Sequence, residues 1–225
     1  PADAKSLGFD RPRISIPGTL LISAIGIVED VRQASSMDLK GAGNLFLLVG
    51  PSWAWPDASG DLRFDWATAC NVHLAVSSLV RSRQVASAHD CSEGGILVAV
   101  AEMCLAGRRG ATLDVSGIRS QSGPQAVPDA MGSLPDSIRA VVPQSSAPCP
   151  RLWEPPTVPL DKWLLAEAPS RYILEVVPSQ IPAFATALAG VPWTVLGVTG
   201  ETSDALTVRG VERDPIRVDV DDLRK

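Results

Sequence analysis

One segment of this sequence combines residue types that could hold a negatively charged ligand: residues 89–95, which read His-Asp-Cys-Ser-Glu-Gly-Gly. The residues that follow, 96–105, are strongly apolar and predict a helix. A helix start presents unpaired backbone N–H groups and the positive end of the helix dipole, and paired glycines let a ligand approach the backbone closely. The pattern therefore predicts an anion or phosphate site at Ser92, Gly94 and Gly95. Capping of the helix with tight packing of the glycines explains the same residues about equally well.

The other side chains of this segment have separate expected roles. Asp90 and Glu93 are negatively charged and would repel a phosphate. Asp90 is therefore expected to orient the loop by accepting backbone hydrogen bonds. Glu93 is expected to cap the helix or, as the family resemblance given below implies, to bind a ribose hydroxyl. His89 could contact a phosphate or make a structural hydrogen bond, and the sequence favours neither role. Cys91 is expected to be a small buried packing residue. No catalytic residue and no metal ligand is predicted.

Polar and aromatic residues elsewhere are given ordinary structural roles. Arg171 stands at the head of an apolar stretch. It could reach an anion, but we expect it to form a surface or interdomain salt bridge. His73 lies among apolar residues on an expected helix, and we expect a core or surface histidine rather than a ligand. The tryptophans at positions 53, 55 and 66 could mark a partner surface, and cover of the core is at least as good an explanation.

The elements that must position these residues alternate along the chain. Helical spacing predicts helices at 66–81, 96–105 and 179–188, of which the second is ended by Gly107. Apolar and β-branched runs predict strands at 19–28, 44–49, 85–88, 111–115, 171–177, 193–198, 205–211 and 216–220. Because several strands are hairpin-like neighbours, we expect an α+β or α/β sandwich, with helices packed on a mixed sheet. A doubly wound nucleotide-binding fold is not expected.

Two regions are expected along the chain, and the second of them contains an insertion. Residues 1–40 are interpreted as a tail and the last strand of a preceding domain, which is what the family resemblance given below implies. The sequence begins with proline rather than methionine, which indicates a fragment or a processed chain. Residues 41–225 are expected to form one domain. Within it, residues 119–159 are rich in proline, serine and glutamine without a clear apolar period. They predict an irregular surface insertion.

Composition excludes several functional classes. A net charge of -5 argues against nucleic-acid binding, which requires clustered basic residues. No apolar run approaches the roughly 18 residues of a spanning helix, so no membrane is expected. The four cysteines form no C-x-x-C pair, which argues against a zinc site and favours a reduced, cytoplasmic setting.

Four segments resemble the C-terminal domain of phosphoribosylformylglycinamidine synthase (formylglycinamidine ribonucleotide amidotransferase), a domain of the aminoimidazole ribonucleotide synthetase type. Residues 87–107 (SAHDCSEGGILVAVAEMCLAG) contain a segment similar to its H-D-x-S-E-G-G signature. Residues 19–50 resemble its junction with the preceding domain, and residues 166–176 (AEAPSRYILEV) its F-x-E-x-P-S-R-Y strand. Residues 190–200 (GVPWTVLGVTG) resemble its closing helix-to-strand turn. The four segments occur in the family's order.

The resemblance implies a function and a set of partners. In that family, ATP phosphorylates an amide oxygen, and ammonia from a glutaminase then displaces the phosphate to give the amidine of purine biosynthesis. ATP and Mg²⁺ are held mainly by ATP-binding-type domains, which would be partners of this chain together with the glutaminase and the ribonucleotide substrate. Ser92, Gly94 and Gly95 would hold the substrate's 5′-phosphate. The fragment itself is expected to bind no cofactor and to be inactive alone, although the whole enzyme is an ATP-dependent carbon–nitrogen ligase.

Two other functions remain open at this point. The chain could be a non-catalytic domain of the same descent that binds a phosphorylated metabolite or acts as a scaffold. It could also belong to an ATP-dependent synthetase of another pathway. The family's usual Gly-Gly-Ser-x-Tyr-type segment is replaced here by residues 59–70 (SGDLRFDWATAC), and no complete ATP-binding-type domain precedes residue 19.

Overall fold

The computed structural model describes residues 20–51, 65–115, 160–202, 205–210 and 215–224. The chain divides into two units, residues 1–31 and 32–225. The described residues of the first unit form no strand, and the short helix η2 (Val31–Gln33) begins at the end of that unit. The strand expected at 19–28 is therefore not formed here, because a strand requires a hydrogen-bonded neighbour, and apolar side chains such as Ile25 are exposed. Its origin in a preceding domain stays a prediction.

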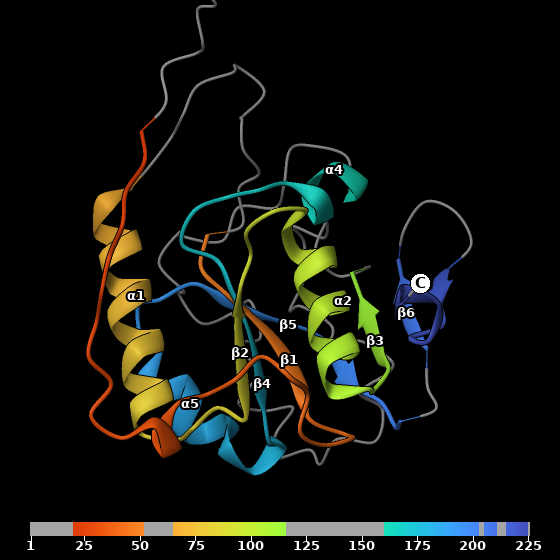
Figure 1. Cartoon of the computed structure of the whole chain (residues 1–225), viewed down its shortest axis with the longest axis horizontal. Helices are drawn as coiled ribbons and strands as arrows, with labels where there is room; N and C mark the ends of the chain where they lie inside the picture. Colours follow the sequence, from red (N-terminus) through yellow and green to blue (C-terminus); the bar gives the residue numbers. More distant parts are fainter. Residues whose placement is uncertain (1–19, 52–64, 116–159, 203–204, 211–214, 225) are drawn as a thin grey trace, which may run out of the picture. The chain divides into compact units, whose positions relative to one another are not determined.

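The described part of the second unit is built around a seven-stranded sheet with the order β2-β4-β1-β5-β3-β6-β7 (Figure 1). Neighbouring strands are antiparallel, except that β3 and β6 are parallel. The predicted mixed sheet is confirmed. The strands are β1 (Leu45–Val49), β2 (Ser87–Asp90), β3 (Ala111–Asp114), β4 (Tyr172–Val176), β5 (Trp193–Thr199), β6 (Leu206–Arg209) and β7 (Ile216–Val218).

Strand β1, in the interior of the sheet, is buried on both faces, which explains its unbroken apolar sequence. Its alternate residues join two separate clusters of buried side chains. Phe46 and Leu48 contact the cluster that includes α2 (Gly95–Gly107) and α4 (Leu160–Leu165). The other three side chains of β1 join the cluster that includes α1 (Trp66–Arg81) and α5 (Ile181–Ala187), which follows the short helix η5 (Pro178–Gln180). Helices thus cover both faces of the sheet, and the predicted sandwich is confirmed (Figure 1).

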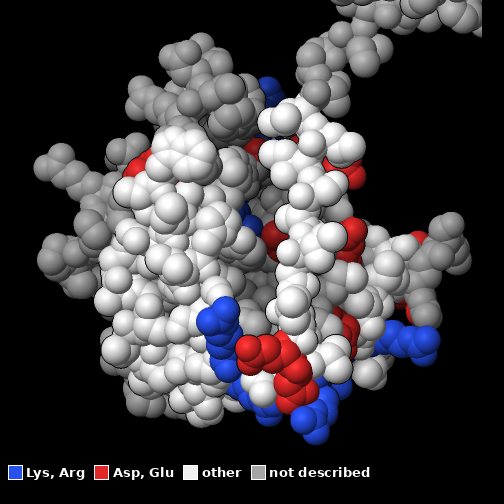
Figure 2. Space-filling model, turned by 60° about the vertical axis from the view of Figure 1, so that its left-hand side comes forward, with Lys and Arg blue, Asp and Glu red and all other residues white. Residues whose placement is uncertain are grey.

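Helix α1 has the bounds that the sequence predicts. Asp65 caps its start, since its carboxylate accepts hydrogen bonds from the Ala67 amide at 2.9 Å and the Thr68 hydroxyl at 2.6 Å. The buried side chains, among them Val72 and Val76, recur at helical spacing. Its only charged residue is Arg81, and Figure 2 shows that the face carrying α1 is largely uncharged above its lower end.

Helix α2 ends at the predicted residue, but that residue does not take the left-handed conformation. Gly107 is still helical, and the residue in the left-handed conformation is Arg108, with φ 52°. Gly107 is required for close packing instead, because a Cβ there would lie 2.5 Å from the backbone nitrogen of Leu39. The helix thus ends at Gly107 as predicted, but Arg108 takes the left-handed position that is usual for a glycine at a helix end.

Parts of the predicted organisation lie outside the described residues. These include the insertion at 119–159 and the tryptophans at 53 and 55, whereas Trp66 is 75% exposed and so does not cover the core. Among the helices described, none is both long and apolar enough to cross a bilayer.

Candidate functional site

Two loops lie beside an open pocket at one end of the sheet. One loop connects β2 to α2, and the other connects α4 to β4. The strands β2 and β4 are hydrogen-bonded neighbours in which Asp90 pairs with Tyr172, so loops far apart in sequence are brought together. The pocket has a volume of about 500 Å³ and is lined by residues 90–92 and 167–172. It is therefore next to the predicted anion-binding segment.

The structure separates the three residues predicted to hold a phosphate. Ser92 lines the pocket, whereas Gly94 and Gly95 are not part of its lining. Gly94 is the residue before α2, with φ 73°, and no side chain caps the helix. Capping by Ser92 or Glu93 is therefore not what the structure shows, because the left-handed glycine makes the turn into the helix. The backbone N–H of Gly95 donates to the Ser92 carbonyl at 3.0 Å.

Gly95 has a packing role that positions the second loop. It is buried and left-handed, with φ 65°. A Cβ there would lie 2.6 Å from the Ala166 carbonyl oxygen and 2.9 Å from the Leu164 carbonyl oxygen. Only glycine lets the start of α2 approach the end of α4 this closely. Contact of Ser92, Gly94 and Gly95 with a phosphate stays a prediction.

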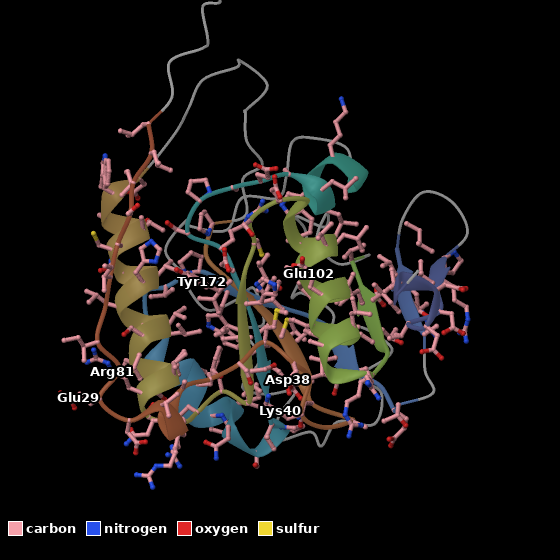
Figure 3. The ribbon with its side chains drawn as sticks, in the orientation of Figure 1. Glu29, Asp38, Lys40, Arg81, Glu102 and Tyr172 are labelled. Atoms are coloured by element: carbon pink, nitrogen blue, oxygen red, sulfur yellow. The ribbon has the colours of Figure 1, made fainter. Side chains whose placement is uncertain are left out.

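His89 makes structural contacts with both ring nitrogens. Its Nε2 lies 3.0 Å from Glu102 Oε2, and its Nδ1 lies 3.3 Å from Asp90 Oδ1. Glu102 projects from α2 beside this end of β2 (Figure 3). The structural hydrogen bond is thus the arrangement observed for His89. Asp90 was expected to accept backbone hydrogen bonds, but in the described ranges its carboxylate contacts His89 instead.

Cys91 is buried, as predicted, with 5% of its surface exposed. It joins the core cluster of α2. Burial raises the pKa of its thiol to about 12, an effect that the nearby Arg171 opposes. The thiol is therefore protonated at neutral pH and is unsuited to act as a nucleophile.

Arg171 is the main correction to the sequence prediction. It is 1% exposed, and burial lowers the pKa of its guanidinium. Its Nη2 donates to the Ala166 carbonyl, while Nε and Nη1 have no hydrogen-bond partner in the part of the chain that is described. The expected surface or interdomain salt bridge is wrong, because the Arg171 side chain, which directly precedes β4, is buried inside the domain.

Ser170 and Tyr172 flank Arg171 and share a histidine. Tyr172 Oη lies 2.7 Å from His73 Nδ1, and Ser170 Oγ lies 3.2 Å from His73 Nε2. Ser170 is left-handed, with φ 61°, a conformation that is costly for a residue with a Cβ and clusters at functional sites. Burial, with the charge of Asp90, raises the pKa of Tyr172. His73 is exposed, in line with the predicted surface histidine, but it also connects α1 to the pocket wall.

Residues 67–209 match the family described as AIR synthase related protein, C-terminal domain. The chain belongs to this family. It is 29% identical over 218 residues to phosphoribosylformylglycinamidine synthase subunit PurL of a Synechococcus species, covering 89% of this chain and 23% of the relative. It is 30% identical over 210 residues to the same subunit of Rhodospirillum rubrum, covering 85% of this chain and 23% of the relative. The predicted resemblance is confirmed, and the chain spans about a quarter of the length of these relatives.

Solved structures share the fold of this AIR synthase-type domain. PurL of Thermotoga maritima complexed with FGAR superposes with a TM-score of 0.56 at 18% identity, covering 86% of this chain and 30% of that chain. The ATP complex of the same protein gives a TM-score of 0.57 at 16% identity, covering 84% and 27%. At these identities the likeness establishes the fold alone.

The residues that sequence reasoning missed come from the second loop of the AIR synthase-type domain. Ser170 and Tyr172 were missed, and Arg171 was considered but assigned to a salt bridge; all three reach the pocket because β4 pairs with β2, a pairing that cannot be read from either strand alone. One signal was present: a serine, an arginine and a tyrosine follow a proline at the head of a buried strand. In the described residues, no group of three or more histidine, cysteine, aspartate or glutamate side chains could hold a metal ion.

Proposed function

We propose that this chain is the C-terminal domain of a phosphoribosylformylglycinamidine synthase. The whole enzyme would use ATP and ammonia from glutamine to convert formylglycinamide ribonucleotide to its amidine in purine biosynthesis, in the cytoplasm. The observation that supports this most directly is the open pocket beside the β2–α2 loop, which carries the segment most similar to the family. The relatives described above, of which this chain covers about a quarter, are PurL subunits.

The part of the reaction assigned to this chain is binding of the substrate's phosphate. Ser92 contributes a hydroxyl on the pocket wall. Gly94 makes the left-handed turn into α2, where a Cβ would lie 2.3 Å from Cγ2 of Val98, so the group it would offer to a phosphate is its backbone N–H. The positive end of α2 favours a negative charge there. The N–H of Gly95 already donates to Ser92, so its contribution is to hold the turn.

ATP and Mg²⁺ are assigned to other domains of the whole enzyme. The described residues of this chain lack the cluster of carboxylates that Mg²⁺ requires. ATP supplies the phosphoryl group that activates the amide oxygen. The side chains of this domain would bind and orient the substrate beside that chemistry. A glutaminase component and the ATP-binding-type domains are the partners proposed for the whole enzyme.

A non-catalytic domain that binds a phosphorylated metabolite is the second candidate function. The same pocket supports it, since phosphate binding does not require the other domains. The two functions are separated by reconstitution. If the chain is part of the ligase, adding it to the remaining domains of a relative restores amidine formation, whereas a purely binding domain does not.

The phosphate role is tested by Ser92→Asp, which places a negative charge on the pocket wall. Formylglycinamide ribonucleotide and inorganic phosphate are titrated into the full chain by isothermal titration calorimetry. We expect the variant to bind each about 10-fold more weakly. Ser77→Asp is the matched control, because Ser77 is exposed on α1 and is not part of the pocket lining. Unchanged affinity in the Ser92 variant, or no binding by the wild-type chain, contradicts the assignment.

A further inference from the structure

Three polar side chains at the pocket form a hydrogen-bonded chain that the proposed phosphate binding does not use. Ser170 Oγ lies 3.2 Å from His73 Nε2, and Tyr172 Oη lies 2.7 Å from His73 Nδ1. The histidine comes from the middle of α1, whereas the tyrosine begins β4. A serine hydroxyl held on one nitrogen of a histidine, whose other nitrogen is also held, is the arrangement of an activated nucleophile.

This group of side chains is within reach of a reagent. Both hydrogen bonds of His73 are exposed to solvent, and His73 itself is exposed on α1. Ser170 and Tyr172 line the open pocket of about 500 Å³. The nucleophile and its base therefore face a space that admits a small organic molecule.

The backbone at Ser170 indicates that the serine is held in place at a cost. Its φ is 61°, a conformation that a residue with a Cβ rarely adopts. In the described ranges, the other non-glycine residues with positive φ are Arg83 and Arg108, which follow helix ends where this conformation is usual. Ser170 instead directly precedes a strand. Such strain persists only where the surrounding structure fixes it, and it clusters at active sites.

Activation of the serine requires one tautomer of His73. Nε2 must accept a hydrogen bond from the Ser170 hydroxyl, and Nδ1–H then donates to Tyr172 Oη. The two distances permit this tautomer, and exchange with water supplies it because the ring is exposed. Burial and the charge of Asp90 raise the pKa of Tyr172, so its hydroxyl stays protonated at neutral pH. Tyr172 therefore orients the ring as a neutral acceptor.

The charges of the lining favour an uncharged substrate. Asp90 and Glu167 are the carboxylates of the lining, and the one cationic side chain there, Arg171, is 1% exposed. The carboxylates repel an anionic substrate and an acid product, and they stabilise the positive charge that develops on the imidazole. A serine with a histidine as its base attacks carboxylic esters at neutral pH.

We propose that Ser170 is a nucleophile that hydrolyses uncharged carboxylic esters, with His73 as its general base. His73 Nε2 takes the hydroxyl proton as Oγ bonds to the ester carbonyl carbon. The bond from that carbon to the alcohol oxygen breaks, and the alcohol leaves with the proton. Water then attacks the acyl group, gives a proton to Nε2 and releases the acid, while Ser170 recovers its hydrogen. The activity goes beyond the proposed function, since it needs neither ATP nor a phosphate.

The first experiment measures the release of para-nitrophenol from para-nitrophenyl acetate by the full chain. Ser170→Gly removes the hydroxyl, and glycine suits the left-handed backbone at this position. It should lower kcat/KM about 100-fold, since the nucleophile and the use of its base are lost together. Arg83→Gly, at a left-handed residue with φ 56° outside the lining, should keep the wild-type rate. A wild-type rate no higher than that of Ser170→Gly overturns the proposal.

An uncharged fluorophosphonate identifies the nucleophile directly, because it bonds to an activated serine with loss of fluoride. Peptide mass spectrometry should place the label on Ser170, with labelling about 100-fold slower in His73→Gln. Leu74→Gln, at a neighbour on α1 that is 70% exposed, is the matched control and should be labelled at the wild-type rate. Labelling of another residue, or equal labelling without His73, shows that the hydrolysis arises elsewhere and contradicts the assignment.

Tyr172 is a positioning residue, which acts through His73. Tyr172→Phe should lower kcat about 5-fold and leave KM unchanged, because the ring loses its orientation while the pocket keeps its shape. In a His73→Gln background it should cause no further loss. A raised KM with unchanged kcat would assign Tyr172 to substrate binding and remove it from the proposed chain of hydrogen bonds.

The charge of the ester tests the substrate class. The monoanionic para-nitrophenyl ester of succinic acid should be hydrolysed about 10-fold more slowly than the acetate, because the carboxylates of the lining repel it. Glu167→Gln removes one of these charges and should narrow the difference. Equal rates for the two esters in the wild type would show that the pocket does not select an uncharged substrate.

Discussion

Glu175 attaches the segment before β1 to the sheet through one buried carboxylate. Its side chain is fully buried on β4. Oε1 accepts hydrogen bonds from the Gly41 amide at 3.1 Å and the Asn44 side chain at 2.6 Å. Oε2 accepts from the Lys40 amide at 2.9 Å and the Ser87 hydroxyl at 2.7 Å. Lys40 lies at the lower end of the sheet in Figure 3, below Tyr172. One carboxylate thus joins the approach to β1 with β2 and β4.

Glu175→Gln is predicted to destabilise the fold strongly. The amide –NH₂ of glutamine would face donors that need an acceptor, which leaves buried polar groups unpaired. The free energy of unfolding should fall by about 3 kcal/mol in urea denaturation. Glu102→Gln, at a carboxylate that is 49% exposed, should cost at most about 0.5 kcal/mol. If Glu175→Gln and Glu102→Gln lowered the free energy of unfolding equally, the buried hydrogen bonds of Glu175 would not be a special source of stability.

Individual residues were predictable where their own chemistry decided their place. Cys91 is buried as expected because a small apolar thiol at the start of a core helix favours burial. Arg171 was not predictable, because arginine is usually exposed and its burial follows from the pairing of β4 with β2. Ser92 lies beside an open pocket, although its role in binding a phosphate stays a prediction, and the rest of that lining includes residues 75 or more positions later.

Among the elements, β5 shows how one missing side chain permits strand pairing. Opposite Phe46 and Leu47 the register between β1 and β5 shifts, next to Gly197. A Cβ at Gly197 would lie 1.9 Å from the Thr112 carbonyl oxygen on β3. Glycine therefore lets β3 approach β5 beside this irregularity, as glycine in a strand often does.

Gly197→Ala is predicted to disrupt the pairing of β3 with β5. The added methyl group meets backbone, which cannot move aside as a flexible side chain would. The expected loss in the free energy of unfolding is about 3 kcal/mol, with faster amide hydrogen exchange in β3. Gly26→Ala is the control, because nothing lies within 4 Å of a Cβ at Gly26. Its effect should stay within about 0.5 kcal/mol.

Whole elements were more predictable than their pairing. The bounds of α1 follow from an aspartate cap and a regular apolar period, both of which are local. The strand predicted at 85–88 is found at Ser87–Asp90 instead, because its hydrogen bonds to β4 determine its bounds. The strand predicted at 19–28 failed for the same reason: its side chains have strand character, but the residues described there have no strand beside them. A glycine inside the apolar run of β5 was the available signal for a register irregularity.

At the scale of the whole molecule, two buried thiols make the folded chain less stable as the pH becomes alkaline. Burial raises the pKa of Cys91 and of Cys104 from 9.0 to about 12. The folded chain therefore holds more protons than the unfolded chain between these values. The contribution of the two buried, protonated thiols to the free energy of unfolding is fully present below pH 9 and is lost as the pH rises toward 12. Burial also raises the pKa of Tyr172 above 10.0, which adds a loss of the same sign.

The predicted consequence is a loss of stability between about pH 8 and about pH 10. Each buried thiol should cost about 1.4 kcal/mol at the higher pH, measured by urea denaturation. In Cys104→Ala only the Cys91 thiol still lowers the free energy of unfolding as the pH rises. The pH dependence of this variant should therefore be about half that of the wild type. Cys70→Ala, at an exposed cysteine, should keep the full pH dependence. The same slope in both variants would rule out the buried thiol as the cause.

The place of β1 in the sheet determines when this domain can fold during translation. Leu45 pairs with Val176 on one side and with Val198 on the other, and both partners are in the last quarter of the sequence. Until the ribosome has released those residues, β1 has two open edges and two uncovered apolar faces, a combination that promotes aggregation. The first strand of the sheet in sequence thus finds both of its neighbours only late. Expression of this domain should accordingly depend on chaperones that hold nascent chains.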